Sequence, residues 1–414
     1  MSRSIVLSER YALLDTYMTA NTHSIDSAYP SEMLLACAVA YRATDEAAHL
    51  AHVNDQWDFL AAYANGDGVI VLPTWSPGLS RDSTARTVVN TVHASRLLRD
   101  MGQTTLADTM IGVCDTQAKW LIDHEATYTQ SVSSQAPYAG VTEVLFAAIL
   151  AVTAPYAGTA FTVDVNQNAE IALMFAMLAN EPSSDFSTTG DYRTKGLDYT
   201  DGHVRMVLAY QDATTGAIPI GTNYLTIYDT VYGRYTLGLV AQLLHEMGSA
   251  WAYRAATLTY LTDGMAWLNS TYSTEPTLGG GYYSAHATAA AELYLDEVVS
   301  ALTDITRTLD GDTCYTDGKF VDPTTRFMLE NYTSAGNGTN ASFDERSEIN
   351  ALIYTQTAAL YGIGAFQPCD LDVRLLSQYD LDVQLLTEYD LDVLLASTRR
   401  RSTIIQSGGV HAWR

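Results

Sequence analysis

The feature that most constrains the fold is a helical hairpin that opens near Asp201. A second helix begins at about Thr230, and the turn 214–221 between the two carries a glycine and a proline that interrupt a helical pattern. The second helix carries apolar residues at the i, i+3, i+4 spacing of a buried face: Val231, Tyr235, Leu239, Val240, Leu243, Leu244 and Met247. Such a hairpin cannot bury its apolar faces alone, so it must stack on other hairpins.

The same order of elements recurs along the chain, with glycine- and proline-containing loops such as 65–75 and 317–323. We predict about ten to twelve helices in all. They comprise two or three helices within residues 8–60, including a run from Pro30 to His52, and then helices over about 84–100, 104–124, 141–154, 166–179, 201–211, 230–247, 250–267, 291–309 and 345–361. Residues 181–199 are rich in Ser, Thr and Asp, which predicts a surface loop.

Stacked hairpins close either as an open solenoid or as a ring. The loops differ in length and carry many aromatic residues, which favours a ring with a cleft, and the resemblance given next rests on the hairpin rhythm and on loops such as 216–219 and 228–232. In this rhythm the chain resembles the (α/α)6 toroid of glycoside hydrolases, polysaccharide lyases and glucuronyl epimerase-like domains, over roughly residues 8–365. The resemblance implies an all-α, helical-hairpin toroid that acts on glycans.

The C-terminal segment differs from the helical body in its sequence pattern, because it consists of short repeats. Asp-Leu-Asp-Val opens three successive units at residues 370, 380 and 390. Because ten is an even number, the apolar residues keep to one side of an extended strand. An amphipathic strand array of this kind needs a partner for its edges and its apolar face. We therefore predict three parts: the toroid over 1–366, a β-repeat docking arm over 367–398, and a basic tail over 399–414.

The repeats resemble those of virion proteins of tailed viruses. That resemblance implies that residues 370–395 bind other virion proteins and that the protein is a homo-oligomer or part of a larger assembly. No signal peptide is recognisable at the N-terminus, and the longest apolar run, 141–154, is too short to span a membrane. We expect a virion or extracellular location without membrane insertion, with a cytoplasmic location as the alternative.

The charge of the chain indicates salty surroundings. The net charge is −25 and only three lysines occur, Lys119, Lys195 and Lys319, a composition that resembles haloarchaeal proteins. Self-repulsion at this charge is screened within about 3 Å at molar salt, but only over roughly 30 Å in dilute salt. Apart from the run 399–401 the chain has no basic patch, so nucleic acid is not an expected partner.

Five residues are candidates for catalysis. Asp229 stands before the second hairpin helix and could act as a general acid or base, with Asp201 and His203 as its partners. Tyr283 and His286 follow three glycines and suit a lyase or an epimerase, which removes a proton beside a carboxylate. The alternative for each is structural, since an aspartate at a helix start caps it and loop aromatics pack.

Candidate glycan-binding residues are aromatic or cationic side chains near the same loops: Trp75, Tyr224, Tyr228, Tyr232, Arg234 and Tyr282. Asp45, His49 and His52 share a helix face, but we interpret them as a solvated polar face rather than a metal site. We predict no metal and no cofactor. Among the four cysteines, Cys37 and Cys114 are expected in the core, while Cys314 and Cys369 could pair.

Three functions remain open on these grounds. The first is a virion component of a haloarchaeal tailed virus whose toroid recognises host-surface glycans, with or without trimming them. The second is a free glycan-active hydrolase, lyase or epimerase. The third is a scaffold whose cleft has lost its chemistry.

Overall fold

The structure is a computed structural model. It describes residues 15, 18–19, 30–70, 81–124, 129–131, 144–146, 165–188, 190–218, 230–272, 277–279 and 331–333. The predicted helices 291–309 and 345–361, the docking arm 367–398, the tail 399–414 and the cysteine pair Cys314 and Cys369 lie outside this part of the chain.

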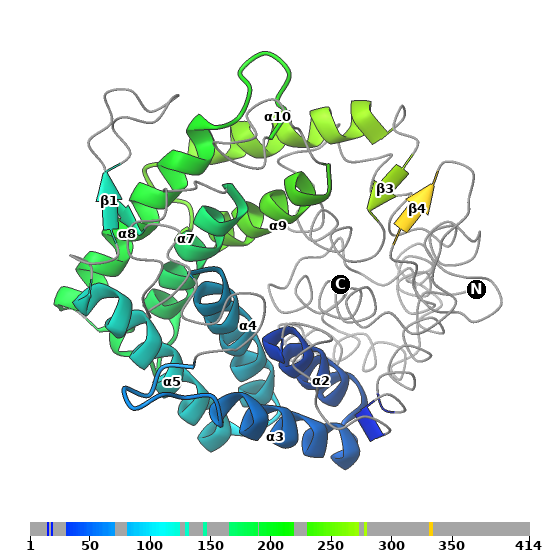
Figure 1. The fold of residues 1–414 in the computed structure, drawn as a ribbon, viewed down its shortest axis with the longest axis vertical. Coiled ribbons are helices and arrows are strands. Elements are labelled where there is room, and N and C mark those ends of the chain that lie inside the picture. The colour runs from blue at the N-terminus through cyan, green and yellow to red at the C-terminus, as the bar shows by residue number, and fades with distance from the viewer. Residues whose placement is uncertain are drawn as a thin grey trace, which may run out of the picture.

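The described part is built mainly of long helices arranged in two layers (Figure 1). They are α2 Pro30–Thr44, α3 Ala47–Ala61, α4 Arg81–Asp100, α5 Thr104–Asp123, α7 Val165–Asn180, α8 Asp191–Ala209, α9 Thr230–Met247 and α10 Arg254–Tyr272. In Figure 1, α2, α4, α7 and α9 follow one another along the inside of an arc, and α3, α5, α8 and α10 lie outside them. The predicted all-α toroid body is therefore confirmed at the level of helical layers.

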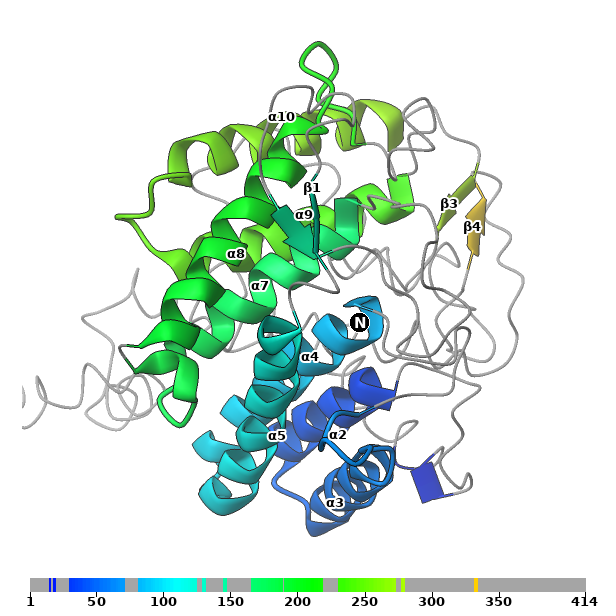
Figure 2. The same cartoon turned by 60° about the vertical axis from the view of Figure 1, so that its left-hand side comes forward.

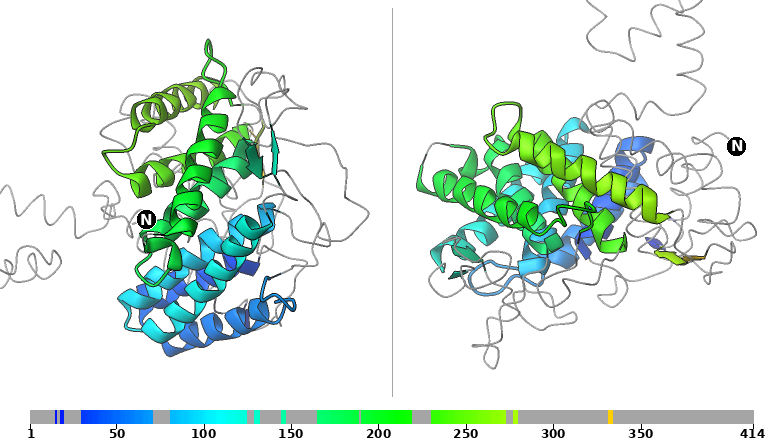
Figure 3. Two further views of the ribbon diagram at one scale, coloured as in Figure 1. Left: turned by 90° about the vertical axis from the view of Figure 1, so that its left-hand side faces the viewer. Right: turned by 90° about the horizontal axis from the view of Figure 1, so that it is seen from above.

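The inner helices are covered on nearly every side. In α2 each residue from Pro30 to Tyr41 is buried, and in α7 burial runs from Val165 to Ala179 with one break, at Gln167. A helix that is apolar nearly all round has to be buried in this way. The outer helix α3 instead buries only five residues along one side. Figures 2 and 3 show the same helices from other viewing directions, with α5 packed beside α4, α8 beside α7 and α10 beside α9.

The four inner helices in the described part of the chain run in the same direction. Arg86 of α4 contacts Glu32 of α2 and Glu170 of α7, all near the helix starts. Near the helix ends, Arg96 of α4 contacts Glu181, directly after α7, and Glu246 of α9. The first turns of α2, α4, α7 and α9 therefore form one face of the molecule, which we call the N-terminal face, and their last turns form the opposite C-terminal face.

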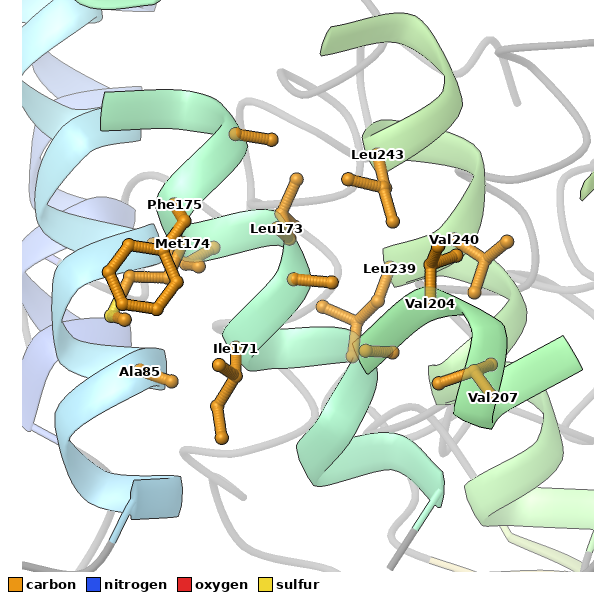
Figure 4. Close-up of a cluster of buried hydrophobic side chains, with 14 of the residues drawn as sticks. Ala85, Ile171, Leu173, Met174, Phe175, Val204, Val207, Leu239, Val240 and Leu243 are labelled. Carbon is orange, nitrogen blue, oxygen red and sulfur yellow. The ribbon is translucent and has the colours of Figure 1, made fainter. Parts of the chain in front are cut away.

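The core fills the space between these layers. The larger cluster joins α4, α5, α7, α8, α9 and α10, and the smaller one joins α2, α3, α4 and α5. Figure 4 shows Phe175 and Met174 of α7 on the side of α4, where Ala85 lies, and the labelled core residues of α8 and α9 together on the other side of α7. Of the apolar stripe predicted for the second helix of the hairpin, Leu239, Val240, Leu243 and Leu244 lie in the core and Met247 packs against it.

The turn of the opening hairpin is held by Asp212 and Gly216. The Asp212 Oδ1 accepts hydrogen bonds from the backbone N–H of Thr214 and Thr215, and Gly216 has a left-handed φ of 74°. Gln211 Nε2 donates to the carbonyl oxygens of Gly216 and of Tyr260 in α10. The predicted interruption by glycine is confirmed, and the turn also fastens α8 to α10.

Two sequence-based assignments are wrong here. The run from Pro30 to His52 is broken after Thr44, because Asp45 has a left-handed φ of 55°. Residues 181–199 are not a loop throughout: α8 begins at Asp191, ten residues before the predicted start, and a 3-10 turn covers Asp185–Ser187. The density of Ser, Thr and Asp concealed this helix, since these residues favour turns by themselves.

The predicted helix 141–154 is also wrong where it can be checked. Val144–Phe146 is a strand, β2, paired antiparallel with β1 Thr129–Ser131. A short apolar run has no period that separates a strand from a buried helix. A second strand pair, β3 Thr277–Gly279 with β4 Asn331–Thr333, brings two distant segments together beyond α10 (Figure 1).

Candidate functional site

The N-terminal face gathers the starts of four inner helices, and four of the predicted site residues belong to the sequence just before α4 and α9. Asp229 directly precedes Thr230, the first residue of α9, and Trp75 belongs to the segment 71–80 that leads into α4. Seven of the predicted residues lie outside the described residues: Trp75, Tyr224, Tyr228, Asp229, Tyr282, Tyr283 and His286. Tyr232 and Arg234 belong to the first turns of α9, where the structure describes the backbone alone.

Asp201 and His203 lie within α8, an outer helix. Asp201 Oδ1 accepts a hydrogen bond of 2.9 Å from the Trp251 Nε1–H, which ties α8 to the segment before α10. His203 is completely buried, and its Nδ1 lies 2.7 Å from Asn168 Oδ1 of α7. Both side chains thus join neighbouring elements, and the structural alternative of a helix cap followed by an exposed histidine is also wrong, since Asp201 lies inside α8 and His203 is buried.

A charged cluster that the sequence analysis did not find lies at the N-terminal face. The Arg86 guanidinium donates through Nε and Nη2 to Glu170 Oε1, at 3.0 and 2.8 Å, and its Nη1 lies 3.8 Å from Glu32 Oε1. Nearby, Asn90 Nδ2 donates to Ser31 Oγ at 3.2 Å, again joining α4 to α2. The available signal was a single acid inside an apolar run, as in Glu170 between Ala169 and Ile171.

The C-terminal face carries a second charged network. Arg96 donates to Glu181 and Glu246, and Arg99 donates to Glu181 and Asp108, so two arginines of α4 join α5, α7 and α9. A pocket of about 420 Å³ opens here. It is lined by Arg96, Arg99, Asp100, Asn180, Glu181, Pro182, His245 and Glu246. These carboxylates pair with both guanidinium groups, so the ion-pair network connects the ends of α4, α7 and α9.

His93 lies about one helical turn before Arg96 in α4. Burial, followed by the nearby Arg96 charge, lowers the pKa of His93 from 6.5 to about 4. Its Nε2 lies 3.0 Å from Gln242 Oε1 of α9. A neutral imidazole at this position joins α4 to α9 over the whole physiological pH range.

Of the residues Asp45, His49 and His52, the first stands between α2 and α3, and the two histidines belong to α3. His52 Nε2 lies 2.9 Å from Asp15 Oδ1, and His49 is buried, so the predicted solvated polar face is wrong for His49. Burial lowers the pKa of His49. Across the part of the chain that the structure describes, no three His, Cys, Asp or Glu side chains are grouped so that they could hold a metal ion.

The two cysteines within the described part are core residues. Cys37 and Cys114 are both fully buried and both have free thiols. Burial raises the pKa of each thiol, so neither is a reactive nucleophile. The prediction for these two residues is confirmed. None of the described helices is both long enough and apolar enough to cross a membrane.

Comparison with solved structures identifies the fold of this chain. No family model matches the sequence, and no curated protein matches it. Solved structures do match: the GH76 α-mannanase of Bacteroides thetaiotaomicron has a TM-score of 0.55 and 10% identity, over 81% of this chain and 86% of that one. The fold is that of the (α/α)6 toroids.

Two further structures support the same fold. A glycosyl hydrolase of family 88 from Bacteroides vulgatus matches with a TM-score of 0.53 and 9% identity, covering 87% of this chain and 99% of that one. The cellobiose 2-epimerase of Spirochaeta thermophila matches with a TM-score of 0.54 and 12% identity, covering 81% and 85% of the two chains. At such identities the toroid shares its helical architecture with these enzymes, while the site residues have to be argued from this chain alone.

Proposed function

We propose that this protein is a glycan-active toroid, and that its glycan site lies at the N-terminal face. The proposal is carried by one observation: the described inner helices α2, α4, α7 and α9 run parallel, so their first turns lie on one face. In the sequence, the candidate residues Asp229, Trp75 and Tyr228 come just before the starts of α4 and α9. Structural neighbours that hydrolyse or epimerise glycans agree with it through their fold.

Asp229 is the proposed acid or base of the site, and the aromatic side chains before α4 and α9 are the proposed sugar-stacking surfaces. A tyrosine or tryptophan offers a large rigid apolar face with a polar edge, which suits a sugar ring. Tyr283 and His286 remain the proposed pair for a lyase or an epimerase reaction. Asp201 and His203 remain candidates of second rank, because each is engaged within the helical layers.

A virion setting is proposed for the same activity. The supporting observation is the decapeptide repeat of residues 370–395, since an amphipathic strand array needs a partner. In this setting the arm would join other virion proteins while the toroid meets host-surface glycans. The net charge of −25 supports a salty environment for that encounter.

The test is an assay of the full chain in molar KCl against neutral surface glycans and uronate-containing polysaccharides. New reducing ends report hydrolysis, and unsaturated uronates report a lyase reaction. Asp229→Asn is the test variant and Asp45→Asn is its control. Asp45 is exposed and stands directly after α2, at the C-terminal face, and asparagine tolerates its left-handed backbone.

We expect product from the wild-type chain and from Asp45→Asn, and none from Asp229→Asn. Glycan retained by the protein without product would support binding alone and remove the enzymatic part of the proposal. A wild-type chain that neither retains glycan nor forms product would overturn the proposed function.

A further inference from the structure

The described residues on both sides of the segment 219–229 contact one helix, α10. On the side before this segment, Ile218 is 2% exposed, and a Cβ added at Gly264 of α10 would stand 3.1 Å from Ile218 Cδ1. Two residues earlier, a Cβ added at Gly216 would stand 2.3 Å from the carbonyl oxygen of Asp263. The chain therefore enters the segment from a fixed point on α10.

The side after the segment is fixed to the same helix by Trp267. A Cβ added at Gly233, in the first turn of α9, would stand 2.7 Å from Cζ3 and 3.1 Å from Cη2 of the Trp267 indole, and 3.9 Å from Ile218 Cβ. Trp267 is 7% exposed, so its ring is enclosed in the packed interior. The residues before and after the segment thus meet at one stretch of α10.

Gly233 is a poor helix former at a position that requires no turn. Glycine is less favourable than alanine inside a helix, because it loses more backbone freedom on folding. The contact with Trp267 accounts for it, since only a residue without a Cβ lets an indole approach the helix backbone this closely. The indole is a rigid plane with only two side-chain torsions. The spacing between the start of α9 and α10 is therefore set by this ring.

We infer that Trp267 is a positioning residue of the proposed glycan site and that it acts through Asp229. Asp229 directly precedes α9 in the sequence, and Gly233 follows it by about one helical turn. A shift of the first turn of α9 therefore displaces the residue that leads into it. Misplacement of a reacting group by about 1 Å can cost about 100-fold in rate. The inference rests on the proposed function and adds to it the support that orients the proposed acid or base.

The test compares Gly233→Ala with Gly196→Ala in the full chain in molar KCl. Gly196 of α8 is also a helical glycine packed on aromatic rings, because a Cβ there would stand 3.1 Å from Phe186 Cδ1 and 3.2 Å from Phe175 Cδ1. Phe186 belongs to the 3-10 turn that follows the end of α7, so this contact is away from the start of α9. The substrates are a neutral α-mannan and polygalacturonate. Thermal unfolding gives the folded fraction of each variant, and we expect only Gly233→Ala to lower kcat, by about tenfold or more per folded molecule.

A second substitution tests whether the indole is the cause. Trp267→Phe removes the Cζ3 and Cη2 atoms that approach Gly233 and leaves room there for a Cβ. We expect Gly233→Ala combined with Trp267→Phe to be at least about threefold more active than Gly233→Ala alone, whereas Trp267→Phe gives no gain in Gly196→Ala. A merely destabilising change would not be rescued in this selective way. If Gly233→Ala does not fold, Trp267→Phe alone carries the test, because loss of the ring support lowers kcat by about threefold or more.

The outcomes separate the inference from the proposed function. If the wild-type chain forms product and Gly233→Ala matches Gly196→Ala in kcat per folded molecule, Trp267 does not position the site, while the proposed function stands. A double variant no more active than Gly233→Ala, or an unchanged kcat in Trp267→Phe where that variant carries the test, overturns the inference in the same way. A wild-type chain that forms no product removes the enzymatic part of the proposed function and this inference with it.

Discussion

The turn at Gly216 offers a quantitative test of how α8 and α10 are joined. Gly216 has a φ of 74°, and a Cβ built there would stand 2.3 Å from the carbonyl oxygen of Asp263 in α10. Gly102, between α4 and α5, has a φ of 80° with nothing within 4 Å of the same position. Replacing each by alanine therefore separates the cost of the backbone conformation from the cost of the close contact.

The expected magnitudes follow from these two geometries. A left-handed backbone costs a residue with a Cβ about 1–2 kcal/mol, and this cost applies to both variants. The contact with a backbone oxygen forces a shift of α10, which adds about 1–3 kcal/mol for Gly216→Ala alone. We therefore expect losses of about 2–5 kcal/mol for Gly216→Ala and about 1–2 kcal/mol for Gly102→Ala. The unfolded-state effect of the two substitutions is the same and cancels in the comparison.

The assay is urea unfolding of the full chain at constant molar KCl, followed by far-UV circular dichroism. The linear dependence of the free energy of unfolding on urea gives each loss from the midpoint and slope. If the two variants lose the same free energy, the close approach of this turn to α10 does not exist in solution. The hairpin would then be joined to α10 in some other way.

Three further predictions concern bonds and charges. Asp201→Ala and Trp251→Phe should each lower the free energy of unfolding by about 1 kcal/mol in urea titrations, and their double variant by no more than either alone, because both remove the same hydrogen bond. Additive losses would contradict this. Because the pKa of His93 is lowered from 6.5 to about 4, the unfolded chain binds a proton between these two pH values and the folded chain does not. Stability should therefore fall by about 1.4 kcal/mol per pH unit as pH decreases from 6.5 toward 4, and His93→Gln should reduce this slope; an unchanged slope refutes the assignment. Lowering KCl from molar to about 0.1 M should reduce the helical circular dichroism of this chain with net charge −25, whereas constant helicity would argue against salt adaptation.

The sequence predicted the long helices where their period was unambiguous. The ranges expected for α4, α5, α7 and α9 agree with the structure to within a few residues, because their apolar faces repeat at helical spacing over four turns or more. The errors occur where local chemistry competes with that period. Asp45 adopts a left-handed backbone that no pattern requires, and the polar start of α8 resembles a loop in composition.

The candidate site was predicted only in part, for a reason of distance along the chain. Sequence reasoning finds residues that are neighbours in sequence, such as Tyr228 and Asp229 before α9. Arg86 and Glu170 are separated by 84 residues, and their contact depends on α4 and α7 running parallel, which no local pattern specifies. His203 shows the converse, since it looked accessible beside Asp201 but is buried against Asn168.

The two faces of the toroid differ in charge for a common physical reason. Parallel inner helices bring several partial positive charges to the N-terminal face and several partial negative charges to the C-terminal face. Arg96 and Arg99, in the last turns of α4, offset the second set and are themselves engaged by Glu181 and Glu246. Glu32, in the first turn of α2, matches the first set. The ends of α4, α7 and α9 are thus joined by paired charges, whereas the sequence just before the starts of α4 and α9 holds the proposed site residues. That difference is the physical basis for placing the proposed site where the inner helices begin.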